Sequence, residues 1–108
     1  MYQGTTPVIP VRIKGVDLTE AKIYLTFRNK NESGDFTFVS GEDFAVEFDG
    51  EDTVGEIALT QERTLSMAYG PHEVQARFVF EDGTSGATKR ATTFVNNVIL
   101  KDVIRYGR

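Results

Sequence analysis

The sequence predicts an all-β domain, an antiparallel β-sandwich of about seven strands with one short helical turn. Apolar and polar residues alternate in run after run, so that Val74, Ala76 and Phe78, for example, share one face of an extended segment. This period of two is typical of strands that are buried on one face only. The runs are short, and turn residues separate them at the spacing of roughly 8–12 residues that is expected in sandwiches.

The first strand is predicted at 8–14 and the second at 21–29. Pro7 and Pro10 cannot donate hydrogen bonds to a neighbouring strand, so the first strand should lie at a sheet edge or enter the sheet late. The turn between the two strands holds Leu18, which we expect to reach the core. The predicted inward residues of these strands are Ile9, Val11, Ile13, Ile23, Leu25 and Phe27.

Three shorter strands are predicted at 35–40, 44–48 and 53–59, after a turn cluster at 31–34. Asp49-Gly50 is a strong hairpin signal between the last two of them. Their predicted inward residues are Phe36, Phe38, Phe44, Val46, Phe48, Ile57 and Leu59.

The only helix-like stretch is 60–65. Thr60 can cap its start, and Leu65 should anchor it to the core. A glutamate at position 63 would complete a capping box, but the chain carries Arg63 there, which indicates a short helix.

The longest predicted strand is 72–81, and Asp82-Gly83 turns the chain into a last sheet strand at 87–95. At Asn96-Asn97 the apolar phase shifts, as at a bulge or a strand end. We expect Phe78→Ala to be the most damaging single change, because it truncates the middle of the longest strand. The predicted core is Ile13, Leu25, Phe27, Val46, Ile57, Leu59, Ala76 and Phe78.

The whole chain, 1–108, is expected to form one domain with two distinct ends. Residues 1–7 form a polar N-terminal arm that should be weakly ordered until it docks. Residues 98–108 form an apolar exit segment beyond the last strand.

The composition excludes several classes of function. The chain has 12 Lys and Arg against 16 Asp and Glu, a net charge of −4, which argues against a nucleic-acid partner. No basic amphipathic helix indicates a membrane surface, and no apolar run is long enough for a transmembrane helix. The start lacks the pattern of a signal peptide, so we expect assembly in the cytoplasm. The absence of cysteine removes disulfides and thiol catalysis.

No constellation of residues indicates catalysis, and we expect no catalytic residue, no cofactor and no metal. His72 is the single histidine, no nucleophile motif accompanies it, and we expect it at the surface where its strand begins. The acidic turn residues match no calcium-binding loop and are interpreted as solvated hairpin turns. These residues are Glu42, Asp43, Asp49, Glu51 and Asp52.

Several short segments resemble a known group of proteins. They are Gln3-Gly4-Thr5-Thr6-Pro7, Asp17-Leu18-Thr19-Glu20-Ala21, Leu59-Thr60-Gln61-Glu62 and the closing 98–104. Together they resemble small virion structural proteins encoded by phages and prophages of Gram-positive bacteria. The opening and the second segment are also similar to the N-terminal immunoglobulin-like module of phage baseplate upper proteins. The chain departs from this group at Arg63 and in 29–35.

The resemblance implies an immunoglobulin-like sandwich and a non-enzymatic structural part of the virion, tail- or baseplate-associated, which is assembled in the bacterial host cytoplasm. Its partners would be other virion structural proteins, with a homo-oligomer as a further form of contact. The alternative is an adhesion module that binds carbohydrate or the host surface, although the absence of tryptophan weakens it.

The expected contact surface combines the arm, the first strand and the exit segment. Apolar residues beyond the last strand should not stay in water if another chain can cover them. The edge strand marked by Pro7 and Pro10 offers a place where such a segment could pair. Alternatively, 98–104 could fold back onto the same sandwich. The candidate interface residues are Tyr2, Thr6, Val8, Leu100, Val103, Ile104 and Tyr106.

Overall fold

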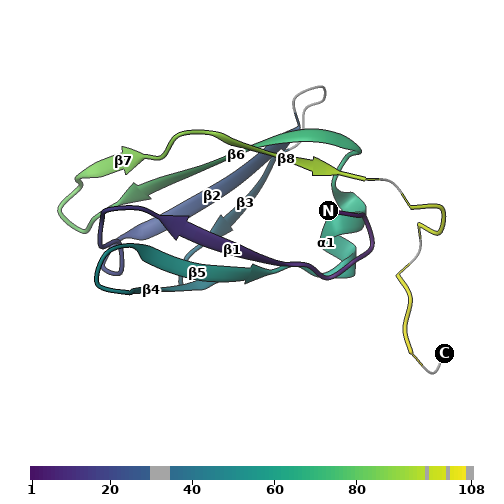
Figure 1. Cartoon of the computed structure of the whole chain (residues 1–108), viewed down its shortest axis with the longest axis horizontal. Helices are drawn as coiled ribbons and strands as arrows, with labels where there is room; N and C mark the ends of the chain where they lie inside the picture. The colour runs from purple at the N-terminus through teal and green to yellow at the C-terminus, as the bar shows by residue number, and fades with distance from the viewer. Residues whose placement is uncertain (30–34, 97, 102, 107–108) are drawn as a thin grey trace.

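The computed structural model describes residues 1–29, 35–96, 98–101 and 103–106, so the predicted turn at 31–34 and Asn97 lie outside it. It is an all-β antiparallel sandwich, which confirms the predicted fold class (Figure 1). In chain order the elements are β1 (Val8–Ile13), β2 (Lys22–Asn29), β3 (Asp35–Val39), β4 (Ala45–Phe48), β5 (Thr53–Ala58), α1 (Gln61–Ser66), β6 (Gly70–Val79), β7 (Ser85–Ala87) and β8 (Ala91–Val95).

One sheet has the strand order β1-β5-β4, and the other has the order β3-β2-β6, with both β7 and β8 paired to β6. The predicted edge position of the first strand is confirmed. The Leu59 N–H donates to the Pro7 carbonyl at 3.0 Å, and Ile9 lies opposite Ile57. Because backbone groups alternate in direction along a strand, the nitrogen of Pro10 faces the free edge, where it has no hydrogen to donate.

The predicted last strand, 87–95, is divided into β7 and β8 by a bulge. Arg77 lies opposite Ala87, whereas Val74 lies opposite Ala91, so two residues of β6 face three residues of the other strand. Thr88 closes the gap, since its hydroxyl accepts from the Ala76 N–H at 3.1 Å and its own N–H donates to the Ala76 carbonyl at 2.9 Å. The extra residue shifts the inward phase, as bulges do.

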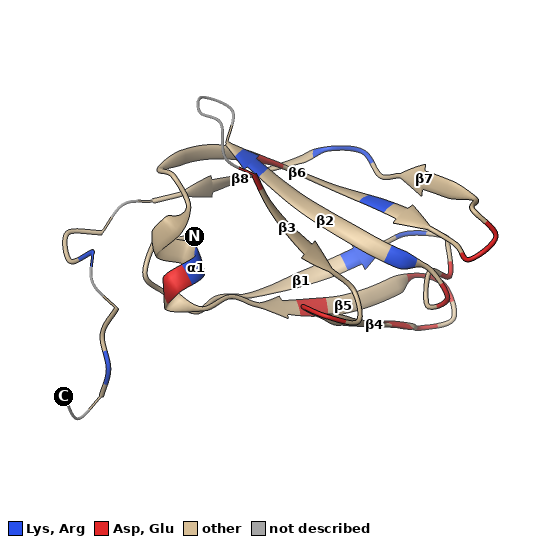
Figure 2. Cartoon of the chain, turned by 180° about the vertical axis from the view of Figure 1, so that it is seen from behind, with Lys and Arg blue, Asp and Glu red and all other residues tan. Residues whose placement is uncertain are grey.

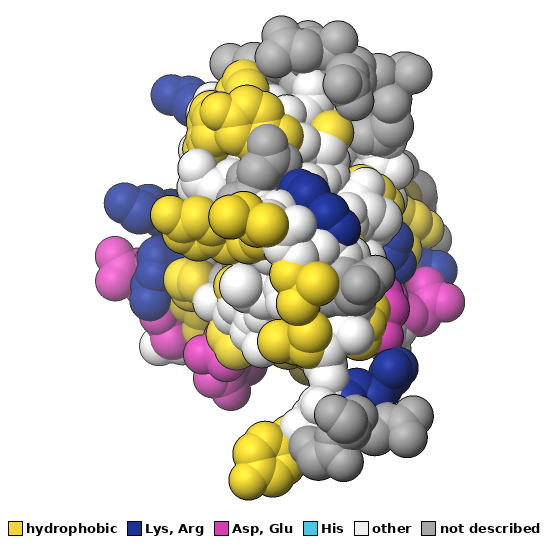
Figure 3. Space-filling view, turned by 90° about the vertical axis from the view of Figure 1, so that its right-hand side faces the viewer, with side chains coloured by type: hydrophobic (Ala, Val, Ile, Leu, Met, Phe, Trp, Pro, Cys, Tyr) yellow, Lys and Arg dark blue, Asp and Glu magenta, His cyan; other side chains and the backbone are white. Residues whose placement is uncertain are grey.

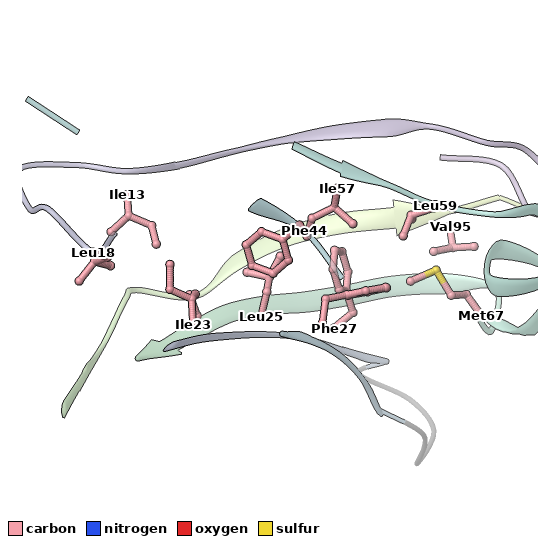
Figure 4. Packing of buried hydrophobic residues seen from close by; sticks show 12 residues of the cluster. Ile13, Leu18, Ile23, Leu25, Phe27, Phe44, Ile57, Leu59, Met67 and Val95 are labelled. Carbon is pink, nitrogen blue, oxygen red and sulfur yellow. The ribbon is translucent and has the colours of Figure 1, made fainter. Parts of the chain in front are cut away.

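The core lies between the two sheets (Figure 4). Six of the eight predicted core residues are buried, and the rings of Phe27 and Phe38 meet edge to face at 5.7 Å. The other two, Val46 and Phe78, are only partly buried and pack against this cluster. The buried apolar residues are Ile13, Leu18, Ile23, Leu25, Phe27, Phe38, Phe44, Ile57, Leu59, Met67, Ala76 and Val95.

His72 is buried, with 1% of its surface exposed, and the expectation of a surface histidine was wrong. It occupies the inward phase of β6 that Val74 and Ala76 continue. Its Nδ1 lies 3.2 Å from the Gly70 carbonyl oxygen, and its Nε2 has no hydrogen-bond partner among the described residues. The strand starts two residues earlier than predicted, so His72 lies inside the alternating run rather than at its start.

The hairpin signals of the sequence are confirmed. Asp49 donates its N–H to the Asp52 carbonyl at 3.0 Å, and Gly50 between them has a φ of 100°. A positive φ at the first central residue is the conformation that type II′ hairpins require of glycine. Gly83 has a φ of 90° in the turn between β6 and β7.

The short helix is also confirmed, with its cap. The Thr60 hydroxyl accepts a hydrogen bond from the Arg63 N–H at 3.2 Å, as an N-cap does. The predicted anchor, Leu65, is only partly buried, whereas Thr64 and Met67 are buried. The residues that anchor α1 to the core are therefore Thr64 and Met67 rather than Leu65.

Candidate interaction surface

The N-terminal arm is docked on its own sandwich, so the expectation of a weakly ordered arm was wrong. Tyr2 forms a parallel bridge with Asn96 just beyond β8. The Asn96 N–H donates to the Met1 carbonyl at 2.7 Å, and the Gln3 N–H donates to the Asn96 carbonyl at 2.9 Å. The arm thus covers backbone groups that would otherwise be free at this edge.

Gln3 fixes the arm from within. Its side chain is buried, and its Nε2 donates to the Met67 carbonyl at 2.7 Å. Its Oε1 accepts from the Lys101 Nζ at 2.6 Å. A polar residue can be buried at low cost when both its amide oxygen and nitrogen are bonded, which is how a polar arm folds back here.

The exit segment is held in place by a second glutamine. The Gln61 side chain on α1 donates from Nε2 to the Ile104 carbonyl at 2.8 Å and accepts at Oε1 from the Ile104 N–H at 2.8 Å. These two bonds hold the backbone of Ile104 at α1. Two apolar side chains of the segment stay largely in solvent, since Leu100 is 57% and Ile104 58% exposed.

Exposed apolar side chains gather at the end of the sandwich formed by the arm, α1 and the exit segment, which we call the helical end. Figure 3 looks at this end and shows hydrophobic side chains in several patches over it. In Figure 1 the exit segment runs past α1 and away from both sheets. The exposed large apolar side chains at this end are Tyr2, Tyr69, Phe94, Ile99, Leu100, Ile104 and Tyr106.

Tyr69 and Phe94 form an exposed aromatic pair whose rings lie at 90° with centroids 5.4 Å apart. The bulge shifts the phase of the strand, so that Phe94 is exposed and Val95 is the buried residue. Neither residue of this pair was among the candidate interface residues. The position of Tyr69 in a turn, outside the predicted strands, was the signal in the sequence that could have identified it.

The candidate interface residues lie in two places. Tyr2, Leu100, Ile104 and Tyr106 are exposed at the helical end, where Val103 is partly buried. Thr6 and Val8 are also exposed, but Val8 starts β1 and lies opposite Ala58 on the outer face of the three-stranded sheet. Gln3 and Gln61, which organise the helical end, were missed because a buried or bridging glutamine leaves no periodic signal.

The acidic turns have structural partners. The Asp52 carboxylate accepts from the Gly15 N–H at 2.9 Å and pairs with Arg12, and these contacts lower its pKa, the backbone bond being the larger cause. The Asp49 carboxylate accepts from the backbone N–H groups of Asp52 and Glu51 at 2.7 and 2.9 Å, which lowers its pKa. Both residues stabilise the hairpin turn. Asp49 is exposed, as interpreted from the sequence, but Asp52 is buried with 8% of its surface exposed, so the interpretation of Asp52 as a solvated residue was wrong.

Within the described part of the chain, no three His, Asp or Glu side chains are grouped so that they could hold a metal ion. In the same residues no helix is long and apolar enough to cross a membrane.

No protein-family model matches this sequence, and the comparison with curated proteins finds no significant match.

Proposed function

We propose that this protein is a non-enzymatic structural part of a phage or prophage particle, tail- or baseplate-associated, that binds other virion proteins through its helical end. The resemblance of its short segments to small virion proteins supports the proposal that it belongs to a phage or prophage particle. The exposure of large apolar side chains at this end supports the mode of action. Its place would be the virion, after assembly in the bacterial host cytoplasm.

One observation carries the proposal: within the exit segment the backbone of Ile104 is bonded to α1, while large apolar side chains beside it stay exposed. Gln61 binds both backbone groups of Ile104, while Leu100 and Ile104 remain more than half exposed. Exposed apolar groups in a cluster mark interaction sites. A segment that is already ordered loses less conformational entropy on binding than a free one, so the clamp favours association.

The test is a double variant, Leu100→Ser with Ile104→Ser, produced together with candidate tail and baseplate proteins. We expect the parent to co-purify with a virion protein or to self-associate. The double variant should bind the same partner at least about tenfold more weakly, a loss of about 1.4 kcal/mol. Ala87→Ser, an exposed change on β7, is the control and should bind like the parent. Binding that is unchanged in the double variant would contradict the proposal.

The adhesion alternative has one observation in its favour, the exposed pair of Tyr69 and Phe94. Aromatic side chains at a surface can provide a platform for sugar rings. The perpendicular rings offer less flat area than a stacked pair would. Binding of a glycan by the parent that is lost in Tyr69→Ala would favour this alternative.

A further inference from the structure

The outer face of the sheet β1-β5-β4 is hollowed. Ile9, Ile13 and Ile57 point into the core, so the alternate residues of these strands face outward. The hollow has a volume of about 530 Å³. Its outward side chains, which we call the acidic face, are Pro10, Arg12, Ala45, Glu47, Val54 and Glu56.

The acidic face combines apolar surface with uncompensated negative charge. Glu47 lies opposite Val54, and Glu56 lies opposite Ala45, so the two carboxylates are diagonal neighbours on one face. Neither forms an ion pair with any described residue, and the nearby Arg12 is paired with Asp49 and Asp52 instead. Figure 2 shows acidic residues along β4 and β5 and in the turns beyond them.

The exit segment is complementary to the acidic face in charge. Residues 98–108 contain three Lys or Arg and one Asp, a net charge of +2, whereas the other residues of the chain carry nine Lys or Arg and fifteen Asp or Glu, a net charge of −6. Arg105 is exposed and has no ion pair within the described residues. Basic and exposed apolar residues in one segment match a hollow whose lining combines Pro10, Ala45 and Val54 with the carboxylates of Glu47 and Glu56.

The segment cannot cover the acidic face of its own chain while its clamp is closed. Gln61 holds Ile104 at α1, beyond the end of β5, and Lys101 donates to Gln3 at the arm. In Figure 1 the segment leads away from the sheets. A second copy can offer its acidic face to the segment without opening these contacts.

We infer that the exit segment of one copy docks on the acidic face of a second copy. This rests on the proposed function, because it names a partner for the helical end. The contact is made through side chains rather than by strand addition to β1, because Pro10 lacks the N–H that the free edge would need. Since two different patches meet, the association is head-to-tail and can continue into a ring or a filament.

The test uses two full-length variants and their mixture. The face variant is Glu47→Lys with Glu56→Lys, and the segment variant is Leu100→Ser with Arg105→Glu. The parent should self-associate in sedimentation or light scattering at low salt, more weakly at high salt, which screens exposed charges. Each variant alone should lose at least about tenfold in association constant, equivalent to about 1.4 kcal/mol.

The mixture gives the decisive result. The face variant keeps an intact segment and the segment variant keeps an intact face, so a 1:1 mixture should form one contact and stop at a dimer. The control is Glu20→Lys with Glu81→Lys, which makes the same charge change as the face variant but in exposed turns. This control should self-associate at least as well as the parent. If the face variant does not fold, Glu47→Gln with Glu56→Gln replaces it.

Two results would overturn the inference, and they separate it from the proposed function. A parent that stays monomeric at high micromolar concentration would contradict docking on a second copy. Co-purification of the same parent with a virion protein would still support the proposed function. Self-association that is lost in the segment variant but kept in the face variant places the contact elsewhere on the second copy. In that case the helical end remains the interaction site.

Discussion

Phe27 is a large side chain enclosed in the core. It is 2% exposed, it is among the largest fully enclosed side chains, and its ring meets that of Phe38. Phe78, in contrast, lies at the margin of the core. Its ring covers Gly86 so closely that a Cβ there would approach ring atoms to 2.6 Å, and it meets Phe80 at 6.1 Å.

We therefore expect Phe27→Ala to cost about 3–5 kcal/mol of the free energy of unfolding, as large core truncations do. Phe78→Ala should cost less, because part of its ring already contacts water. This corrects the expectation that Phe78→Ala would be the most damaging change. Urea unfolding of the two variants measures both values, and a larger loss for Phe78→Ala would contradict the core described above.

Arg63 shows how a single departure from a local rule has a tertiary role. The sequence lacks the glutamate of a capping box at this position, yet Thr60 still caps the helix. The Arg63 guanidinium lies over the rings of Phe36 and Phe38, at 5.2 and 5.5 Å from their centroids. A cation over an aromatic face is attracted to it, so this side chain stabilises the contact between α1 and β3.

Among the secondary-structure elements, β5 is central to its sheet because both β1 and β4 pair with it. Gly55 lies opposite Val46 on β4 and opposite Val11 on β1. A Cβ at this position would lie 2.5 Å from the Ala45 carbonyl oxygen and 3.0 Å from Val46. The close approach involves backbone, which a rotamer change cannot relieve.

Gly55→Ala should therefore lower the free energy of unfolding by about 1–3 kcal/mol, the usual cost of overpacking. Thermal or urea unfolding measures the change. Ala58→Ser, at an exposed position on the same strand, is the control and should stay within about 0.5 kcal/mol of the parent. A neutral Gly55→Ala would mean that β4 can move away from β5 and that this edge is loosely held.

Across the whole molecule, charge is arranged by region rather than spread evenly. The hairpin between β4 and β5 joins Asp49 and Asp52 to Arg12 on β1, and on the other sheet Glu73 pairs with both Arg28 and Arg90. Hydrogen bonding from Arg28, the largest cause, lowers the pKa of Glu73. The carboxylates in these networks are held in their charged form.

This arrangement predicts an acid-sensitive fold. The pKa of Asp52 is lowered in the folded protein, so its contribution to stability is complete above the ordinary Asp pKa of about 3.9 and is lost as the pH falls through the lower folded value. Asp52→Asn should lower the melting temperature at pH 7. Between about pH 5 and 2, the melting temperature of this variant should fall by less than that of the parent. Melting curves over this range measure both effects.

Glu81→Gln is the matched control for this prediction, because its carboxylate has no hydrogen bond or ion pair within the described residues. It should melt like the parent at neutral pH and keep the acid dependence of the parent. An Asp52→Asn variant with the full acid sensitivity of the parent would show that other carboxylates dominate.

The fold class and most of the core follow from the sequence, because alternation along a strand is a local property. Leu25 and Phe27 on β2, the edge position of the proline-marked strand, the hairpin at Asp49-Gly50 and the cap at Thr60 are all confirmed. Each depends on backbone chemistry within a few residues, which the sequence displays directly.

The tertiary structure decided what depends on distant neighbours. The burial of His72 was within reach of the alternation once the start of β6 was known, but the bulge that exposes Phe94 arises from the register of β8 on β6. The docking of the arm by Gln3 and the clamping of the exit segment by Gln61 join residues 98 and 43 positions apart. Such contacts depend on how two sheets and a helix meet, and no local pattern encodes that geometry.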